Sequence, residues 1–239
     1  MFMHESTIIW NDNQIPISRY FDDVYFNTDG AVDETRYVFI EGNCLYDRFL
    51  QHQQETFTIG ETGFGSGLSF LITWQTFKQF RQKNPNSNLK KLNFFSVEKY
   101  PLSASEMSKI HNKVINHNDA LWPLAKQLQD SLKRSDVDSL EEANLLICYD
   151  DISCFADFLV QQNSFIDAWF FDGFSPAKNP DMWNESLFKH CYQLTREKGT
   201  FATFTAAGFV RRNLINAGFN VEKRKGFGLK REMLIGQKI

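Results

Sequence analysis

The sequence predicts an α/β fold with a mostly parallel seven-stranded sheet, a C-terminal antiparallel hairpin and a small N-terminal β extension. Three observations predict it. Residues 56–70 read as a strand, a glycine-rich turn and a helix, and several short apolar runs lack the alternation of a half-exposed strand. Acids follow most of these runs. The 239 residues suit one large domain with an extension, which we place at 56–239 and 1–55.

The N-terminal part is predicted to be a small β element followed by a connector. Apolar residues at 8–10 and 15–17 flank turn-forming residues at 11–13, which favours strands within 7–26. Residues 27–55 read as a mixed connector that becomes helical from about Tyr46.

The core elements follow in alternation. Ser103 and Glu106 have the spacing of a capping box, and the polar stretch 80–91 reads as a loop. Strands are predicted at 56–62, 92–98, 143–149, 166–172 and 200–205, with a closing pair at 219–225 and 231–238. Helices are predicted after Gly67, from Ser103, and over 119–134, 183–195 and 206–217.

The glycine-rich turn carries the strongest functional signal. Gly63, Gly65 and Gly67 alternate between the first core strand and its helix, a spacing that lets a ligand approach bare amides at a helix N-terminus. The usual occupant is a nucleotide-like cofactor, and the competing interpretation is a glycine-rich surface turn. A dinucleotide frame, G-x-G-x-x-G, would need its last glycine at Leu68, which disfavours an NAD-dependent oxidoreductase.

The acid before the glycines narrows the cofactor. Glu61 would repel a pyrophosphate, but it can receive the cationic methionine end of S-adenosylmethionine (SAM). The frame E-x-G-x-G-x-G is the first motif of class I SAM-dependent methyltransferases, which have a Rossmann-like fold. We therefore expect SAM as the cofactor and S-adenosylhomocysteine as its product.

Carboxylates stand near the carboxyl ends of the predicted strands, where open parallel sheets bind ligands. Glu98 is placed to accept the ribose hydroxyls of a nucleoside, and Asp151, after Asp150, to accept the exocyclic amine of adenine. Asp172 ends the next strand. A single acid there is usually a cap or turn residue, but several in register with a glycine motif indicate a site.

The loop at 172–183 suits methylation of nitrogen. Such a reaction needs a deprotonated amine at attack distance and stabilisation of the positive charge that forms on it. Asp172 can stabilise that charge and accept the proton, while Phe174 and Trp183 could exclude water and hold a flat base. The alternative is a structural loop in which Asp172 caps the following helix.

Several motifs together resemble the methyltransferase domain of the MnmC family and its stand-alone relatives, called MnmD. They are FDDVYF at 21–26, ETRYVF at 34–39, ETGFGSGL at 61–68, VEKYPL at 97–102, DGFSPAKNPDMW at 172–183, AAGFVRR at 206–212, KRKGFG at 223–228 and KREM at 230–233. The resemblance implies methylation of 5-aminomethyl-(2-thio)uridine at the tRNA wobble position, giving the 5-methylaminomethyl form.

The resemblance also implies a set of site residues, with departures from the family pattern at Ser66, Ser69, Asp150 and Leu229. Asp172 is the expected catalytic residue. The expected cofactor-binding residues are Glu61, Gly63, Phe64, Gly65, Gly67, Glu98, Lys99, Asp151 and Asp172. The expected substrate-binding residues are Phe174, Pro176, Lys178, Trp183, Arg211 and Lys225.

The expected macromolecular partner is tRNA. Between positions 208 and 232 there are seven Lys or Arg against two Glu, in a chain whose net charge is only −3. A phosphate-contacting face or an ordinary solvated hairpin would both explain this, and the resemblance favours RNA. The FAD-dependent oxidase domain of bifunctional members is absent here, so we expect a separate or fused oxidase to act on the preceding intermediate.

Composition argues against several other classes. Residues 1–10 carry an acid and no long apolar run, so we expect no signal peptide, and no segment approaches the length of a membrane span. The four cysteines and five histidines do not cluster at metal spacing, which predicts no metal and reduced thiols in the cytoplasm. A polyamine-synthase-like transferase and a non-catalytic RNA-binding module with this fold remain alternatives.

Overall fold

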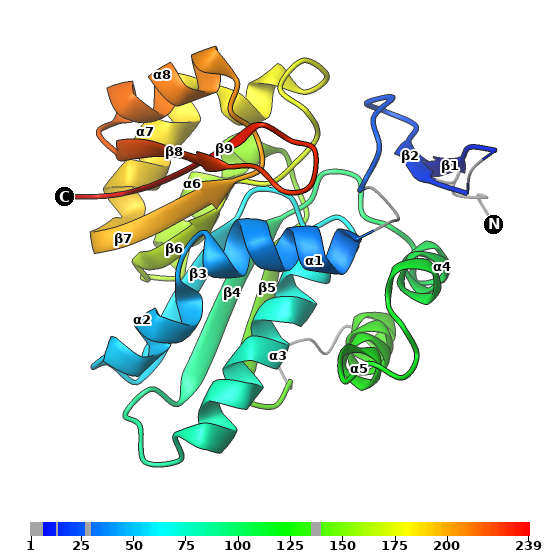
Figure 1. The fold of residues 1–239 in the computed structure, drawn as a ribbon, viewed down its shortest axis with the longest axis horizontal. Helices are drawn as coiled ribbons and strands as arrows, with labels where there is room; N and C mark the ends of the chain where they lie inside the picture. The colour runs from blue at the N-terminus through cyan, green and yellow to red at the C-terminus, as the bar shows by residue number, and fades with distance from the viewer. Residues whose placement is uncertain (1–6, 13, 27–29, 135–139) are drawn as a thin grey trace.

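The computed structural model describes residues 7–12, 14–26, 30–134 and 140–239. Within them, the main sheet has the order β5-β4-β3-β6-β7-β9-β8 (Figure 1). Its parallel strands are β3 (Thr56–Glu61), β4 (Lys91–Val97), β5 (Ala143–Cys148), β6 (Ile166–Phe170) and β7 (Thr195–Thr203). The hairpin strands β8 (Asn220–Lys225) and β9 (Glu232–Gln237) pair antiparallel. The predicted fold class is confirmed.

The strand order places a ligand-binding crevice at one edge of the sheet. The chain runs outward from β3 through β4 to β5, then returns to the other side of β3 and continues through β6 to β7. The direction of winding therefore reverses between β3 and β6. Open α/β sheets bind ligands beyond the carboxyl ends of the strands at such a switch point.

Two helical layers cover the sheet, each with its own hydrophobic cluster (Figure 1). Aromatic side chains at consecutive strand positions point to opposite layers: Phe94 and Phe170 belong to one cluster, Phe95 and Trp169 to the other. The first layer contains α1 (Ala31–Thr35), the π-helix η1 (Arg36–Glu41), α2 (Leu45–Gln51), α3 (Leu68–Lys83), α4 (Ala104–Val114) and α5 (Leu121–Arg134). The second contains α6 (Phe155–Gln161), α7 (Glu185–Leu194) and α8 (Gly208–Ala217).

The N-terminal hairpin is formed by β1 (Ile8–Trp10) and β2 (Pro16–Ser18), as expected within 7–26. Part of its predicted turn, Asn13, lies outside the described residues. Ile8 packs with Leu102 and Ile110, so the hairpin rests beside α4 (Figure 1).

Two predicted boundaries were wrong because burial extends the elements. Residues 80–91 do not form one loop: α3 continues to Lys83, since Phe80 is fully buried, and β4 already begins at Lys91. The connector is helical from Ala31, well before Tyr46. There the wide π turn brings the consecutive residues 38–40 into the core, a pattern that α-helical periodicity does not reveal.

Around the loop that follows β6, the elements are also shifted. The strand β6 ends at Phe170, so Asp172 belongs to the loop rather than to the strand. The helix α7 stops at Leu194, and β7 starts at Thr195, five residues before the predicted strand. Exposed polar residues of β7 near its start hid this part of the strand from the hydrophobic pattern. The predicted capping box of α4, by contrast, is present in both directions.

Candidate active site

The glycine turn connects β3 to α3 with backbone angles that favour glycine. Gly65 and Gly67 have φ of 51° and 72°, and Gly67 caps α3. A Cβ atom on Gly67 would lie 2.7 Å from Cζ of Phe64, so a side chain does not fit there. The turn therefore presents backbone rather than side chains, as a ligand lying on a helix N-terminus requires.

A buried histidine supports this turn from below, which the sequence pattern did not indicate. Nε2 of His111 lies 2.8 Å from the carbonyl oxygen of Ser66, and Nδ1 lies 2.8 Å from the side-chain amide of Gln129. Burial lowers the pKa of His111 to about 4, so the ring is neutral at physiological pH. Since the carbonyl of Ser66 can only accept, Nε2 of the neutral ring carries the proton and donates to it, and Nδ1 accepts from the amide nitrogen of Gln129. In the sequence, only the position of His111 within a predicted helix pointed to it.

Glu61 lies at the end of β3 with no exposed surface. The hydroxyl of Ser96 donates to Oε2 at 2.7 Å, but Oε1 accepts no hydrogen bond from the described residues. Burial, and then the negative charge of Asp172, raise the pKa of Glu61 well above its usual range. An unpaired buried carboxylate oxygen is costly unless a donor or a cation from outside reaches it.

Glu98 follows β4 and fastens the glycine turn. Its Oε2 accepts the backbone N–H of Gly65 and its Oε1 that of Tyr100, both at 2.9 Å. Burial raises the pKa of Glu98, and these backbone donors oppose the rise. Each carboxylate oxygen has a further lone pair, so the side chain can still accept hydroxyl groups from a ligand.

Asp151 follows β5 and is held by neighbours. Its Oδ2 accepts a hydrogen bond from Nζ of Lys99 at 2.8 Å, and its Oδ1 accepts the backbone N–H of Ser153 at 3.0 Å, capping the 3₁₀-helix η3 (Ile152–Cys154). The hydrogen bond from Lys99 is the main reason that the pKa of Asp151 falls to about 2.

Asp172 stands two residues after β6. Its Oδ1 accepts the N–H of Gly173 at 2.8 Å, while its backbone carbonyl accepts the hydroxyl of Thr62 at 2.7 Å. Burial raises the pKa of Asp172 to about 6, with a smaller contribution from the charge of Glu34. This carboxylate can therefore gain and lose a proton near neutral pH.

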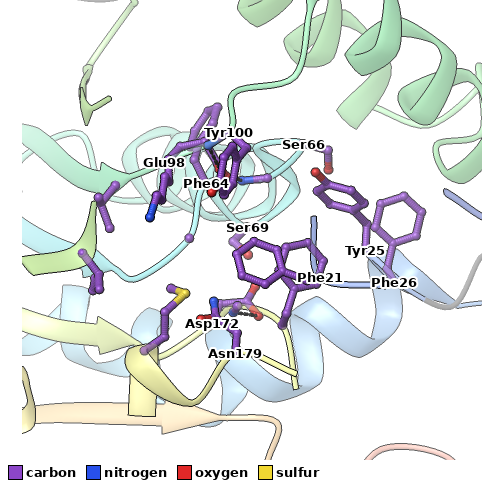
Figure 2. Close-up of a pocket in the computed structure, with 18 of the residues that line it drawn as sticks. Phe21, Tyr25, Phe26, Phe64, Ser66, Ser69, Glu98, Tyr100, Asp172 and Asn179 are labelled. Atoms are coloured by element: carbon purple, nitrogen blue, oxygen red, sulfur yellow. Dashed lines mark hydrogen bonds between the residues drawn. The ribbon is translucent and has the colours of Figure 1, made fainter. Parts of the chain in front are cut away.

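One cavity brings most of the predicted residues together (Figure 2). Among the predicted site residues, Gly63, Phe64, Gly65, Glu98, Lys99, Asp151, Asp172 and Phe174 line it. The structure adds residues that sequence reasoning did not assign: Phe21, Tyr25, Phe26, Thr35, Tyr100, Ile152, Asn179, Asp181 and Met182. The first three belong to the motif FDDVYF at 21–26, which supported the family resemblance but was not assigned to the site.

Two residues predicted to bind the cofactor lie next to this cavity rather than in its wall. Glu61 is buried beneath it, and Gly67 is the buried cap of α3.

Several predicted substrate residues lie elsewhere. Trp183 is 1% exposed in the core, where its indole N–H donates to the carbonyl of Phe174 at 3.0 Å. Pro176 is buried as well. Neither side chain lines the cavity. Trp183 belongs to the 3₁₀-helix η4 (Pro180–Trp183), which turns its indole into the core.

The basic residues predicted to bind substrate lie outside the cavity lining. Lys178 is exposed and pairs with Asp22 at 3.0 Å. Arg211 is half-buried on α8, and Lys225 is exposed at the end of β8. Some of the basic hairpin is paired within the chain: Lys223 with Glu232, Arg224 with Glu41 and Lys230 with Glu34.

Comparison with known proteins identifies relatives. A family model described as S-adenosyl-L-methionine-dependent methyltransferase matches residues 105–239. The tRNA 5-methylaminomethyl-2-thiouridine biosynthesis bifunctional proteins MnmC of Aliivibrio fischeri and Vibrio cholerae are 43% and 44% identical over 238 residues. These alignments cover 95% of this chain but 34% of each relative, so the chain spans about a third of their length.

A solved structure shares the fold. The crystal structure of MnmC2 from Aquifex aeolicus superposes with a TM-score of 0.74 at 22% sequence identity, covering 98% of this chain and 71% of that one.

Among the described residues, no helix has the length and apolarity needed to cross a bilayer. The same residues contain no group of three or more potential metal ligands.

Proposed function

Because the chain belongs to the family of S-adenosyl-L-methionine-dependent methyltransferases, we propose that it methylates the primary amine of 5-aminomethyl-(2-thio)uridine at the wobble position of tRNA. The products are the 5-methylaminomethyl nucleoside and S-adenosylhomocysteine. The observation that carries the substrate is the identity of 43–44%, over 95% of the chain, to proteins named for the biosynthesis of that nucleoside.

The residues around the glycine turn fit SAM. The free Oε1 of Glu61 offers an acceptor to the ammonium of the methionine part, and Glu98 offers acceptors to ribose hydroxyls. Asp151, with Ile152 beside it in the lining, offers an acceptor and an apolar surface to adenine. When bound, SAM supplies a methyl group on a sulfonium sulfur for in-line displacement.

Asp172 is the residue best suited to manage the proton. The acceptor amine must lose one proton when nitrogen forms its bond to carbon and the carbon–sulfur bond breaks. A carboxylate whose pKa is about 6 is ionised at pH 7 to 8, yet basic enough to accept that proton. Its negative charge also stabilises the positive charge that develops on nitrogen.

The loop beyond Asp172 is held so that its side chains keep their positions. Trp183 donates to the carbonyl of Phe174, and the N–H of Asn179 donates to the carbonyl of Ser175 at 3.0 Å. We assign Trp183 and Pro176 to supporting the loop, and Phe174 to contact with substrate. Water is excluded from the reacting atoms by the aromatic lining.

The substrate's phosphates would contact basic residues that lie outside the cavity lining. Lys178, Arg211 and Lys225 are assigned to this role, with the C-terminal hairpin providing the rest of the positive charge. Two further parts of the proposal rest on the relatives. They are bifunctional and about three times as long as this chain, so an oxidase, fused or separate, would supply the aminomethyl substrate. The 56–239 core would act as the methyltransferase domain.

The test is product identification. The protein is incubated with methyl-labelled SAM and tRNA carrying 5-aminomethyluridine, and the digested nucleosides are analysed by mass spectrometry. We expect label only in 5-methylaminomethyluridine, and none with tRNA that carries unmodified uridine. Label in polyamines or other small amines, with none in the tRNA, would favour a small-molecule transferase instead.

A further inference from the structure

A segment far from the glycine turn in sequence forms part of the cavity wall. After β2 the chain makes a tight turn, in which the N–H of Ser18 donates to the carbonyl of Asp23 at 2.8 Å and that of Asp22 to the carbonyl of Ser18 at 2.9 Å. We call residues 16–26 the N-terminal arm. Its Phe21, Tyr25 and Phe26 line the same cavity as Asp172 (Figure 2).

Polar contacts fasten the arm to the loop that carries Asp172. Oδ2 of Asp23 accepts the backbone N–H of Ser175 at 2.7 Å, and Asp22 pairs with Lys178 at 3.0 Å. Ser175 directly follows Phe174, so the first contact fixes the arm against the backbone of that aromatic residue. Residues 152 positions apart in sequence thereby form one wall.

Three aromatic rings meet at this junction. Phe21 and Phe174 stack with their centroids 4.7 Å apart and an interplanar angle of 28°. Tyr25 meets Phe174 edge to face at 5.1 Å. All three line the cavity, so each has surface that faces its interior. We call Phe21, Tyr25 and Phe174 the aromatic cradle.

We propose that the aromatic cradle binds the flat ring of the acceptor base, so that the N-terminal arm is part of the substrate site. This inference rests on the proposed function, which requires a wobble base to leave its stack and enter the site. Extruded bases are commonly held by stacking on aromatic side chains. Phe174 of the cradle belongs to the loop of Asp172, whereas Glu98 and Lys99 follow β4 and Asp151 follows β5, where the nucleoside of SAM would bind.

The position of the arm predicts which binding step a substitution of Phe21 affects. Phe21 comes from the arm and Phe174 from the catalytic loop, so the cradle is complete only while the arm is docked. Replacing Phe21 should therefore weaken binding of the acceptor and leave binding of SAM nearly unchanged. If the arm only covered the cofactor, replacing Phe21 would instead weaken the binding of SAM and of the acceptor to a similar degree.

Photocrosslinking tests the location directly. An anticodon stem-loop with 5-iodouridine at the wobble position is irradiated with the full chain, and crosslinked peptides are identified by mass spectrometry. We expect crosslinks at Phe21, Tyr25 or Phe174. Crosslinks confined to other residues would overturn the inference. The readout needs no turnover, so an inactive protein that crosslinks at the cradle would refute the proposed reaction while supporting the base site.

Kinetics with matched variants tests the role. Phe21→Ala should raise the KM for tRNA about ten- to a hundredfold, the range for loss of one base–aromatic stack. Phe21→Leu, which keeps apolar volume but lacks a ring face, should do nearly the same. The control is Phe165→Ala, an exposed phenylalanine outside the arm and the cavity lining, directly before β6. Equal KM values for the Phe21→Leu variant and wild type, with both proteins folded, would contradict stacking, as would a parallel loss of SAM affinity.

Discussion

The two ends of the cavity are built differently. At the end where we propose that the cofactor binds (the cofactor end), β3, β4 and β5 follow one another along the chain and pair side by side, and an acid stands at or just after the end of each strand: Glu61, Glu98 and Asp151. At the acceptor end, the wall is assembled from the N-terminal arm and the loop of Asp172, which are joined by Asp23 and the backbone of Ser175. Neighbouring strands thus fix the cofactor end, while distant segments must meet to form the acceptor end.

The two ends share the same kinds of contact. Glu98 at one end accepts the backbone N–H groups of Gly65 and Tyr100, and Asp23 at the other accepts that of Ser175. Each end also has an exposed lysine–aspartate pair, Lys99 with Asp151 and Lys178 with Asp22, and such pairs contribute only about 0–1 kcal/mol. The ends therefore differ in how far apart their parts lie along the chain rather than in the kind of contact that holds them.

Replacement of Asp172 should have the largest effect. Asp172→Ala removes the group that accepts the proton, so turnover should fall by roughly 10²–10⁴ with binding of SAM largely retained. Single-turnover kinetics at saturating SAM measures it. A loss below about fivefold would remove Asp172 from the catalytic role.

Replacement of Glu98 should act on the cofactor end alone. Glu98→Ala should raise the dissociation constant of SAM about ten- to a hundredfold, because a charged hydrogen bond contributes about 1.5–3 kcal/mol. Calorimetry measures the affinity. Glu98→Gln retains an acceptor for the glycine turn and should lose less of the affinity for SAM. Glu222→Ala, which replaces an exposed acid on β8, controls for net charge. An unchanged affinity in Glu98→Ala would refute the ribose assignment.

The basic hairpin should affect tRNA affinity in a salt-dependent way. If Lys225 contacts one phosphate, Lys225→Ala should make the log–log salt dependence of tRNA affinity less steep by about 0.7–0.9. Lys90→Ala is the matched control, because Lys90 precedes β4 and thus lies at the opposite end of the strands. Filter binding over a salt series measures both. Equal slopes in wild type and Lys225→Ala would exclude this contact.

The smallest effect concerns stability without ligand. Since the pKa of Asp172 is raised from 3.8 to about 6, the folded protein binds its proton more tightly than the unfolded chain does. Stability from this group is full below pH 3.8, falls as pH rises to about 6, and stays low above it. Asp172→Asn removes the charge, so it should raise Tm by a few degrees at pH 8 and leave it nearly unchanged at pH 4. Calorimetric scans in which the gain is equal at both pH values would contradict the buried charge.

Local sequence was enough to predict which residues gather around the glycine turn. The glycines and the acid at Glu61 are adjacent in sequence, and strands in a parallel sheet bring their carboxyl ends to one edge, so Glu98 and Asp172 could be placed in the same cavity. The fold class followed from the same pattern. The predicted element boundaries were wrong where packing overrides local polarity, as in the connector that is helical from Ala31 and in the early start of β7.

The acceptor end could be predicted only in part. Phe174 was expected to face substrate because it lies two residues after Asp172. Trp183 was expected beside it, yet its large apolar ring gains more by burial in the core, where its N–H still finds a carbonyl. Phe21 and Tyr25 were missed as site residues because only the folded chain brings the arm to the loop.

The most direct test of the central claim is a crystal structure with sinefungin, an unreactive amine analogue of SAM. The ammonium of its amino-acid part should lie about 3 Å from the free Oε1 of Glu61. Its ribose should face Glu98, and the amine that replaces the methyl sulfonium should face Asp172. Sinefungin bound away from the glycine turn, or with its amine pointing away from Asp172, would contradict the account.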